Sequence, residues 1–389
     1  MKTYDVIVMG LGAHGASTLY QLAKRGKRVL GIDRYDPPHE QGCSHGDTRI
    51  TRLAIGEGEA YSPLAIRSHQ IWREIESQIT EKLLTVTGGL IISSPGVTAV
   101  NHVPKLFENT LAAAAKHGIK HMVLGASAIR ERFPAFQVRD DEIGYYEPEA
   151  GFLRPERCIK TQLLLAKRCR AEVMTKTPVI GFGPDRLGVA VYTKNEVIYA
   201  ERLVICAGAW VARFLGPKYA HLFSVRRQEL YWFDVEDDAP FRPGHFPVFY
   251  WELQGDRQGI YGFPAIDGLR GGIKIATEQT RVATTPEEVD RAIDLESGHA
   301  MYLRNIRHQL TGLIPKPVRS KVCLYTVTPD AGFIVDTHPE NAAVTVVSAC
   351  SGHGFKHSAA LGEAIAEQIV RGKSAIPLDA FALSRFATP

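Results

Sequence analysis

The first 33 residues alternate between strand-like and helical patterns of apolar side chains. Tyr4–Met9 is a short β-branched run, Gly10–Gly15 is rich in glycine, and Ala16–Arg25 repeats apolar residues at helical spacing. Lys27–Asp33 returns to a strand pattern. This order predicts a strand, a glycine turn, a helix and a second strand, which together make a βαβ unit.

The middle of the chain predicts further helices and strands and contains no repeat. Helical spacing of apolar residues predicts helices over Pro63–Ile79, Pro104–His117 and Pro155–Arg170. Alternating or β-branched runs predict strands over Leu90–Ser93, Leu187–Tyr192, Ile198–Cys206 and Gln228–Val235.

The last part of the chain repeats the opening arrangement. Ala343–Ala349 predicts a strand, Gly352 and Gly354 a turn, and Ser358–Val370 a helix. A strand, a glycine turn and a helix N-terminus in both places indicate that the two parts build one nucleotide site. We therefore expect the middle of the chain to form a second domain, which suits a length of 389 residues.

The glycines of the first turn have the spacing of a dinucleotide fingerprint. Gly10, Gly12 and Gly15 fit GxGxxG, in which small residues permit a tight turn and close approach of the backbone to a pyrophosphate. Asp33 ends the next strand about 20 residues further on, where an acid binds a ribose hydroxyl. This acid favours FAD or NAD over NADP, and the glycines do not separate the first two.

Composition and charge exclude several other classes of protein. The chain is 45% hydrophobic and 23% charged, which is typical of a globular protein. Its formal net charge of +4, without a basic run, gives no support for a nucleic-acid or membrane partner. No apolar stretch reaches the roughly 20 residues that span a bilayer, and no signal-peptide pattern is present, so we predict a soluble cytoplasmic protein.

The cysteines are scattered along the chain without a CxxC pair. Their spacing indicates neither a zinc site nor a disulfide framework, so we predict no metal and reduced thiols. For any one of them, the ordinary role is that of a small buried hydrophobe. The six are Cys43, Cys158, Cys169, Cys206, Cys323 and Cys350.

Three separated motifs distinguish FAD from NAD. They are Gly42–Glu59 (GCSHGDTRITRLAIGEGE), Cys323–Asp330 (CLYTVTPD) and Ser351–Lys356 (SGHGFK). In this order they resemble the monomeric sarcosine oxidase and N-methyltryptophan oxidase family, whose members include pipecolate oxidases. The resemblance extends from Asp5 to the closing LSRF at Leu383–Phe386.

The resemblance implies an α/β fold with two domains. One is a Rossmann-like FAD-binding domain of the glutathione-reductase type, expected at residues 1–85, 150–215 and 320–389. The other is an α+β substrate domain on a mixed sheet, expected at residues 86–149 and 216–319. The resemblance also implies that FAD is joined covalently to Cys323 by a thioether, which would fix the ring and raise its potential.

The same resemblance assigns roles to charged side chains. Arg52 and Lys356 match the pair that binds the substrate carboxylate through charge-assisted contacts, and Lys356 is also expected beside the cofactor. Lys274 matches a lysine that activates oxygen, since a cation stabilises the negative charge that forms during electron transfer to O2. His45 and Arg49 match catalytic and cofactor-binding residues, where positive charge near the ring favours reduced flavin.

The remaining expected site residues shape the pocket or the cofactor turn. Tyr261 and Tyr325 match aromatic residues that line the substrate pocket. Gly352, His353 and Gly354 precede a helix whose N-terminus can stabilise negative charge on the ring.

Two positions depart from the family pattern. Glu278 stands where sarcosine and pipecolate oxidases carry histidine, and Ile55 replaces a tyrosine on the pocket side. We expect both changes to fall near the substrate. The added acid at Glu278 either favours a cationic side chain or points to solvent.

The resemblance predicts oxidation of a secondary or N-methyl amino acid to an imine that hydrolyses in water, with O2 reduced to H2O2. The expected partners are the amino acid and O2, and the expected state is a monomer. Three alternatives stay open. They are a cyclic imino acid oxidase of the pipecolate or proline type, a flavin dehydrogenase with another electron acceptor, and a non-catalytic protein that keeps FAD as a structural part.

Overall fold

Strands β1 (Thr3–Met9) and β2 (Val29–Ile32) lie side by side and parallel, joined by helix α1 (Ala13–Lys24), as the βαβ pattern predicts. The computed structural model describes residues 3–94, 103–255, 257–268, 271–279 and 282–386. Every residue of β2 is buried, which explains its continuous apolar run. The helix begins at Ala13 instead of the expected Ala16 because Gly12, with extended backbone, already caps it.

These two strands belong to a large, mostly parallel sheet. Its other strands in the described residues are β9 (Glu172–Met174), β10 (Val179–Asp185), β11 (Gly188–Thr193), β12 (Val197–Ile205), β19 (Ile334–His338) and β20 (Asn341–Ser348). The order of the parallel strands is β20, β12, β1, β2, β9. Antiparallel β19 pairs with β20, and the β10–β11 hairpin pairs with β12.

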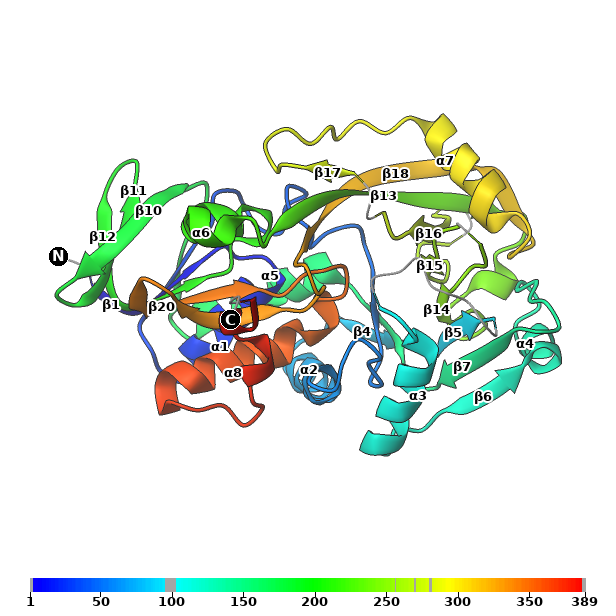
Figure 1. Cartoon of the computed structure of the whole chain (residues 1–389), viewed down its shortest axis with the longest axis horizontal. Helices are drawn as coiled ribbons and strands as arrows, with labels where there is room; N and C mark the ends of the chain where they lie inside the picture. The colour runs from blue at the N-terminus through cyan, green and yellow to red at the C-terminus, as the bar shows by residue number, and fades with distance from the viewer. Residues whose placement is uncertain (1–2, 95–102, 256, 269–270, 280–281, 387–389) are drawn as a thin grey trace.

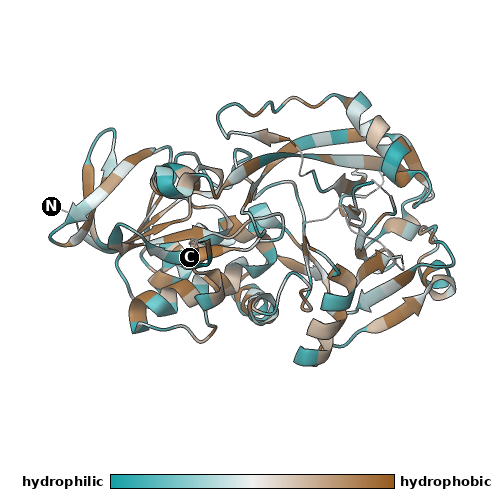
Figure 2. Cartoon of the chain, in the orientation of Figure 1, coloured by the Kyte–Doolittle hydropathy of each residue, from teal (hydrophilic) through white to brown (hydrophobic). Residues whose placement is uncertain are grey.

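The two faces of this sheet are covered differently. Val6 and Val8 of β1 pack on the helical side with Leu19 and Leu361, whereas the alternate residue Ile7 packs on the other face, in a core that the β10–β11 hairpin helps to form. Figure 1 shows most of the helices of this half below the sheet, and Figure 2 shows brown, apolar stretches along its strands. The helices are α1, α2 (Tyr61–Glu76), α5 (Pro155–Arg168) and α8 (Ser358–Arg371).

A second, mixed sheet forms the other half of the molecule (Figure 1). In the described part of the chain it runs β17, β13, β16, β15, β14, β5, β7, β6, and β18 also pairs with β13. Among the strand pairs that the described residues form in this sheet, only β14–β5 is parallel. The bounds are β5 (Gly89–Ser93), β6 (Met122–Gly125), β7 (Ile143–Glu147), β13 (Ser224–Val235), β14 (Val248–Trp251), β15 (Ile260–Gly262), β16 (Ile273–Thr277), β17 (Ala283–Thr284) and β18 (Leu313–Val327).

Smaller elements connect the two halves. A short antiparallel sheet has the order β3 (Arg49–Thr51), β8 (Gly151–Leu153), β4 (Leu84–Val86). The other α-helices are α3 (Leu106–His117), α4 (Ala126–Arg132), α6 (Pro217–Ala220) and α7 (Leu295–Met301). Short stretches of 3-10 helix lie at Gly208–Phe214, Ala239–Phe241, Phe355–His357, Asp379–Phe381 and Leu383–Phe386, and a π-helical turn at Tyr302–Ile306.

The expected domain boundaries stay a prediction. The strands of the parallel sheet come from residues 3–32, 172–205 and 334–348, and those of the mixed sheet from residues 89–147 and 224–327. β18 lies across the expected boundary at residue 320 because it pairs along β13 from Leu313 to Val327. Residues 95–102 of the expected substrate domain lie outside the described residues.

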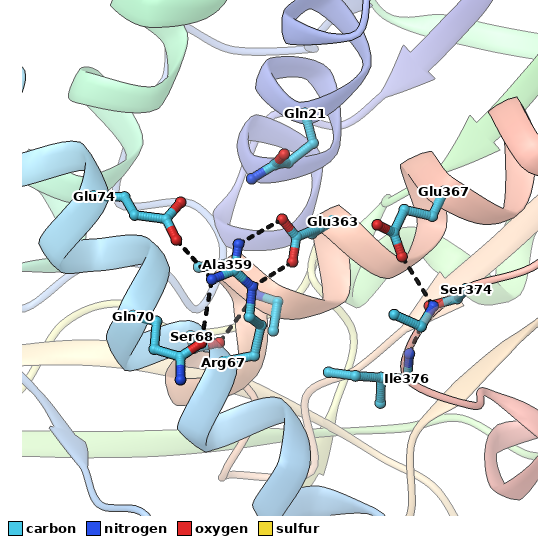
Figure 3. A network of polar contacts seen from close by, with 12 residues as sticks. Gln21, Arg67, Ser68, Gln70, Glu74, Ala359, Glu363, Glu367, Ser374 and Ile376 are labelled. Atoms are coloured by element: carbon cyan, nitrogen blue, oxygen red, sulfur yellow. Dashed lines mark hydrogen bonds and ion pairs between the residues drawn. The ribbon is translucent and has the colours of Figure 1, made fainter.

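An ion-pair network joins helices α2 and α8. The guanidinium of Arg67 on α2 donates to both carboxylate oxygens of Glu363 on α8, at 2.6 and 2.9 Å, and to Glu74 on its own helix at 2.6 Å. Figure 3 shows Arg67 directed toward both acids. A two-pronged contact of this kind between planar groups fixes the orientation of one helix against the other.

Replacing Arg67 with methionine is expected to lower the free energy of unfolding by about 1–2 kcal/mol, because the largely buried Glu363 loses its main partner. Although burial raises the pKa of Glu363, its bonds from Arg67 lower it overall. A lowered pKa stabilises the fold above the unfolded value and loses this effect as pH falls, so the difference should shrink below about pH 4. Urea unfolding of the wild type and the variant measures this difference in free energy.

Glu74→Gln is the matched control for this prediction. Glu74 is 43% exposed and makes only one of the three contacts, so its loss should cost less than about 1 kcal/mol. Equal losses for the two variants would contradict the role given to Glu363.

Candidate functional site

Two cavities meet where the halves of the molecule face each other. The first, here called the strand-end cavity, has a volume of 580 Å³ and lies at the carboxyl ends of β1, β2, β12 and β20. The second, the inner cavity, has 130 Å³ and is bordered by the mixed sheet. Arg49, Tyr325, Gly352 and Phe355 line both. The carboxyl ends of strands in an open parallel sheet are where such folds bind ligands.

The glycines of the fingerprint are required by close backbone contacts. Gly10 has a φ of +86°, and a Cβ there would lie 2.3 Å from the carbonyl oxygen of Cys206. A Cβ on Gly15 would lie 1.7 Å from the oxygen of Gly10, so helix and turn pack backbone to backbone. Gly10 and Gly12 line the strand-end cavity, whereas Gly15 supports the turn from behind. This is the division of roles that a pyrophosphate site needs.

Asp33 lies at the end of β2 in the wall of the same cavity. Its carboxylate accepts hydrogen bonds from the backbone N–H groups of Leu11, at 2.7 Å, and Tyr35, at 2.8 Å. These contacts tie the acid to the glycine turn. A carboxylate held there is placed to receive ribose hydroxyl groups, so the cavity fits the dinucleotide part of FAD.

The second glycine turn lies opposite the first. Gly352 has a φ of +81°, and a Cβ on Gly354 would lie 1.8 Å from the oxygen of Ala349. Both line the strand-end cavity, and His353 lines the inner cavity. His353 stacks on Phe333 with ring centres 4.7 Å apart. The structure thus brings both glycine turns to one cavity, although more than 330 residues separate them.

Cys323 is buried on β18 beside Arg49. The Arg49 guanidinium lies 3.5 Å from the Cys323 sulfur and donates to the carbonyl oxygen of Cys43 at 2.6 Å. Burial raises the pKa of the Cys323 thiol, and the charge of Arg49 opposes this effect. The sulfur lines the inner cavity next to the wall that both cavities share.

His45 does not line either cavity. It is buried, with Nε2 3.1 Å from the oxygen of Gly42. Burial, helped by the charges of Arg49 and Lys321, lowers its pKa to about 3. The imidazole is therefore neutral near pH 7, and the expected positive charge at His45 is not supported. Arg49 is the cation on the shared wall.

Arg52 and Lys356 converge on one carboxylate, that of Glu57. Arg52 donates to Glu57 Oε2 at 2.6 Å and Lys356 to Oε1 at 3.2 Å, and Lys356 also donates to the oxygen of His353 at 2.9 Å. Arg52 donates further to the oxygen of Ala54. Although burial raises the pKa of Glu57, the two cations hold it well below its usual range. All three side chains line the inner cavity.

Two tyrosines line the inner cavity together with this cation pair. The hydroxyls of Tyr261 on β15 and Tyr325 on β18 are 3.4 Å apart. Burial raises the pKa of Tyr261 to about 12 and that of Tyr325 further above its ordinary value. Both groups therefore stay neutral and can donate or accept hydrogen bonds.

Lys274 on β16 lies behind the wall of the inner cavity and not in it. Its ammonium donates to the carbonyl oxygens of Gly46, at 2.8 Å, and Thr48, at 2.7 Å, and lies 4.2 Å from the ring centre of Phe263. Burial lowers its pKa well below the ordinary value, aided by Arg49. Thr48 and Arg49 separate it from the cavity, so its expected role in oxygen activation stays a prediction.

The two residues that depart from the family pattern, Glu278 and Ile55, lie in different surroundings. Glu278 lines the inner cavity, where its charge contributes to raising the pKa of Tyr261 and of Tyr325. Ile55 is 1% exposed, packs in the core of the helical side and does not line the inner cavity, so its expected place near the substrate stays a prediction. Its N–H donates to the hydroxyl of Ser62.

Several site residues were missed in the sequence. Glu57 lies in a quoted motif five residues after Arg52, a spacing that could have suggested the ion pair. Glu147 accepts hydrogen bonds from the N–H groups of Leu53 and Ala54 and so fixes the backbone after Arg52. No local pattern marks Glu147 as part of the site, because Leu53 and Ala54 are more than 90 residues away from it.

Two further findings concern the described residues only. They contain no cluster of three or more acidic, histidine or cysteine side chains suited to a metal ion. Among their helices, none has the length and apolar character needed to cross a bilayer.

Comparison with known proteins agrees with this geometry. Residues 5–368 match the family described as FAD dependent oxidoreductase. The chain is 37% identical to monomeric sarcosine oxidase of Streptomyces avermitilis, over 99% of this chain and 98% of that protein. It is 34% identical to N-methyl-L-tryptophan oxidase of Yersinia pestis, over 98% of this chain and 99% of that protein.

A solved structure shows the same fold. NikD, described as an unusual amino acid oxidase essential for nikkomycin biosynthesis, matches with a TM-score of 0.81 and 22% identity over 98% of each chain. At this identity the likeness bears on the fold alone. Together with the family match, it confirms the expected fold class, a Rossmann-like domain joined to a mixed-sheet domain.

Proposed function

This chain belongs to the family of FAD-dependent oxidoreductases, and we propose that it oxidises a secondary or N-methylated amino acid, with O2 as the electron acceptor. The product is an imine, which water hydrolyses to an amino acid and an aldehyde. The relatives that share a third or more of its residues along nearly its whole length support this substrate class.

The observation that carries the proposal is the cation pair in the inner cavity. Arg52 and Lys356 surround one carboxylate, that of Glu57, and together the three groups have a net charge of +1. A substrate carboxylate of charge −1 balances it. Because these groups are largely buried, their contacts with the substrate are little weakened by water. The shared wall at Arg49 and Tyr325 places such a substrate next to the strand-end cavity.

The side chains of the inner cavity also orient the amine. With the carboxylate on Arg52 and Lys356, the rest of a small amino acid extends toward the hydroxyls of Tyr261 and Tyr325. These neutral hydroxyls can hold the amine nitrogen in its neutral form, which has the electron pair that oxidation requires. Bound FAD, held by Gly10, Gly12, Asp33 and the second glycine turn, supplies the two-electron acceptor that O2 regenerates with release of H2O2.

Cavity size and charge narrow the choice of substrate. At 130 Å³ the inner cavity is below the roughly 300 Å³ at which pockets for drug-sized ligands begin, so it suits small amino acids. Glu278 adds a carboxylate to the wall, which favours a substrate with an extra cationic or hydrogen-bond-donating group. A screen should therefore compare neutral and basic N-methyl amino acids.

Peroxide release in air tests the proposed function. We expect H2O2 with sarcosine or another small N-methyl amino acid, and a matching amount of aldehyde. Release of H2O2 only with pipecolate or proline would show that the substrate is a cyclic imino acid instead. Bleaching of the flavin without release of H2O2 would show that the electron acceptor is not O2. No bleaching with any amine would contradict the proposal.

We also propose a covalent thioether between FAD and Cys323. The sulfur lies on the inner-cavity side of the shared wall, and Arg49 favours the thiolate that must attack. Acid precipitation of the holoenzyme should give a yellow pellet. The variant Cys323→Ser should give a colourless pellet and a yellow supernatant, whereas Cys206→Ser, which removes a thiol from the strand-end cavity, should keep the colour. A colourless wild-type pellet would contradict the link.

The oligomeric state, the cellular location and the domain boundaries also remain proposals. A monomer is proposed from the name of the sarcosine oxidase relative. A cytoplasmic location is proposed from the sequence. The two-domain boundaries are proposed from the resemblance and the two sheets.

A further inference from the structure

Three cysteines that are far apart in the sequence lie together beside the shared wall. The sulfurs of Cys43 and Cys350 are 3.9 Å apart, and the Cys323 sulfur lies 3.5 Å from the carbonyl oxygen of Cys43. Cys43 and Cys350 both line the strand-end cavity and are both partly accessible. The proposed thioether accounts for Cys323 and leaves the other two thiols without a role.

The surroundings of the pair make Cys350 the better nucleophile. The backbone N–H of Thr326 donates to its sulfur at 3.4 Å, and the N–H of Gly352 also faces it. The Cys43 thiol, followed by these N–H groups and Arg49, lowers the pKa of Cys350 to about 6 despite burial. The same contact and burial raise the pKa of Cys43 well above its ordinary value. These shifts favour the thiolate form of Cys350 and the protonated form of Cys43.

We propose that Cys43 and Cys350 are an oxidative modification site in which hydrogen peroxide converts the two thiols to a disulfide beside the FAD. The pairing stands on the 3.9 Å separation of the sulfurs, their shared cavity and the donors around Cys350.

The chemistry balances with peroxide as the only oxidant. The Cys350 thiolate attacks one peroxide oxygen, the O–O bond breaks, and the leaving hydroxide takes a proton to become water. Cys350 is then a sulfenic acid. The Cys43 sulfur attacks it, the S–S bond forms, the S–O bond breaks, and a second water leaves with the thiol proton. Two electrons pass from the thiols to peroxide.

The backbone around both residues is suited to closure. A disulfide needs sulfurs about 2.0 Å apart, so the pair must approach by about 1.9 Å. Cys43 lies in residues 33–48, which contain no helix or strand, and Cys350 is the second residue after β20. Side-chain rotation with a small shift of these loops can bring the sulfurs together.

The bond would tie together two parts of the site. Cys43 accepts the hydrogen bond from Arg49, and Cys350 begins the loop that leads to Gly352 and Lys356. Pulling them together displaces the Arg49 contact, so we expect the disulfide form to turn over more slowly and to recover on reduction. The inference rests on the proposed function only for its source of peroxide inside the site.

The experiment uses the holoenzyme with added hydrogen peroxide and no amine, so its result does not depend on the proposed activity. After oxidation, free thiols are alkylated and the protein is digested and analysed by mass spectrometry. Cleavage after acidic residues is needed because trypsin leaves Cys323 and Cys350 in one peptide, whereas Asp330, Asp336 and Glu340 lie between them. We expect a Cys43–Cys350 cross-link, loss of two titratable thiols, and reversal of both by dithiothreitol.

Variants assign the bond to its partners. Cys43→Ser and Cys350→Ser should each abolish the cross-link. Cys206→Ser should keep it, because burial raises the pKa of Cys206 to about 12 although this thiol lines the same cavity. Absence of the cross-link in wild type, a cross-link to Cys323, or its persistence in Cys43→Ser would each overturn the proposal.

Discussion

The variant Lys356→Met is expected to lose roughly 10²-fold or more in kcat/KM for the amino acid substrate. Removing one partner of a buried, hydrogen-bonded charge pair costs about 2–5 kcal/mol, and each 1.4 kcal/mol is about tenfold. Here the loss removes a donor to the substrate carboxylate and leaves Glu57 with Arg52 alone, so the net charge of this group of side chains falls from +1 to zero. Steady-state kinetics with the best amine measures it.

The matched control is Lys116→Met. Lys116 pairs with Glu59 but is 53% exposed and lies outside the inner cavity, so kcat/KM should change less than about twofold. Equal losses in the two variants, or no loss in Lys356→Met, would contradict the assignment of the carboxylate site.

The pH dependence of carboxylate binding gives a second test of the same lysine. Burial, opposed by the charge of Glu57, lowers the pKa of Lys356 to about 8. Below that pH the ammonium is present, and above it the donor charge is lost. Binding of propionate, which has no amine to titrate, should therefore weaken as pH rises past about 8. Calorimetry should show this loss of propionate affinity above about pH 8, and Lys356→Arg should remove it.

The variant Lys274→Met is expected to slow the reaction of the reduced enzyme with O2 by about 10²–10³-fold, the usual effect of removing one preorganised charge or donor. The ammonium lies against the backbone of Thr48, next to Arg49 on the shared wall. A cation there stabilises the negative charge that O2 gains, although burial acts against the charged form. Anaerobic reduction by the amine, measured by stopped flow, should change little.

The separation of the two half-reactions decides the role of Lys274. Its bonds to Gly46 and Thr48 also hold the loop before Arg49, so a purely structural role would slow reduction and reoxidation together. Normal reoxidation in Lys274→Met would rule out a role in oxygen activation.

Local patterns predicted β1, β2, β11, β12 and β20 of the parallel sheet, but only β5 and β13 of the mixed one. β1, β12 and β20 are apolar because both faces of their sheet are covered, so their runs are plain in the sequence. β18 was missed because its first half carries two prolines and is mostly exposed, and it is a strand through its pairing with β13. That pairing is long-range and leaves no local signal.

The site was predicted largely through the resemblance. The pattern alone found Gly10, Gly12 and Asp33, because a phosphate turn fixes residue types at short spacing. Arg52 and Lys356 are 304 positions apart, and only the fold shows that they meet at Glu57. Burial, which lowers the pKa of His45 to about 3, cannot be read from its neighbours in the chain.

The strand order β20, β12, β1, β2, β9 has a consequence for how the chain folds during its synthesis on the ribosome. β1 emerges some 190 residues before its neighbour β12 and more than 330 residues before β20. During that interval the apolar edge of β1 is unpaired and prone to wrong partners. The strand-end cavity closes only when Gly352 and Gly354 arrive, so retention of the cofactor reports that synthesis has passed this turn.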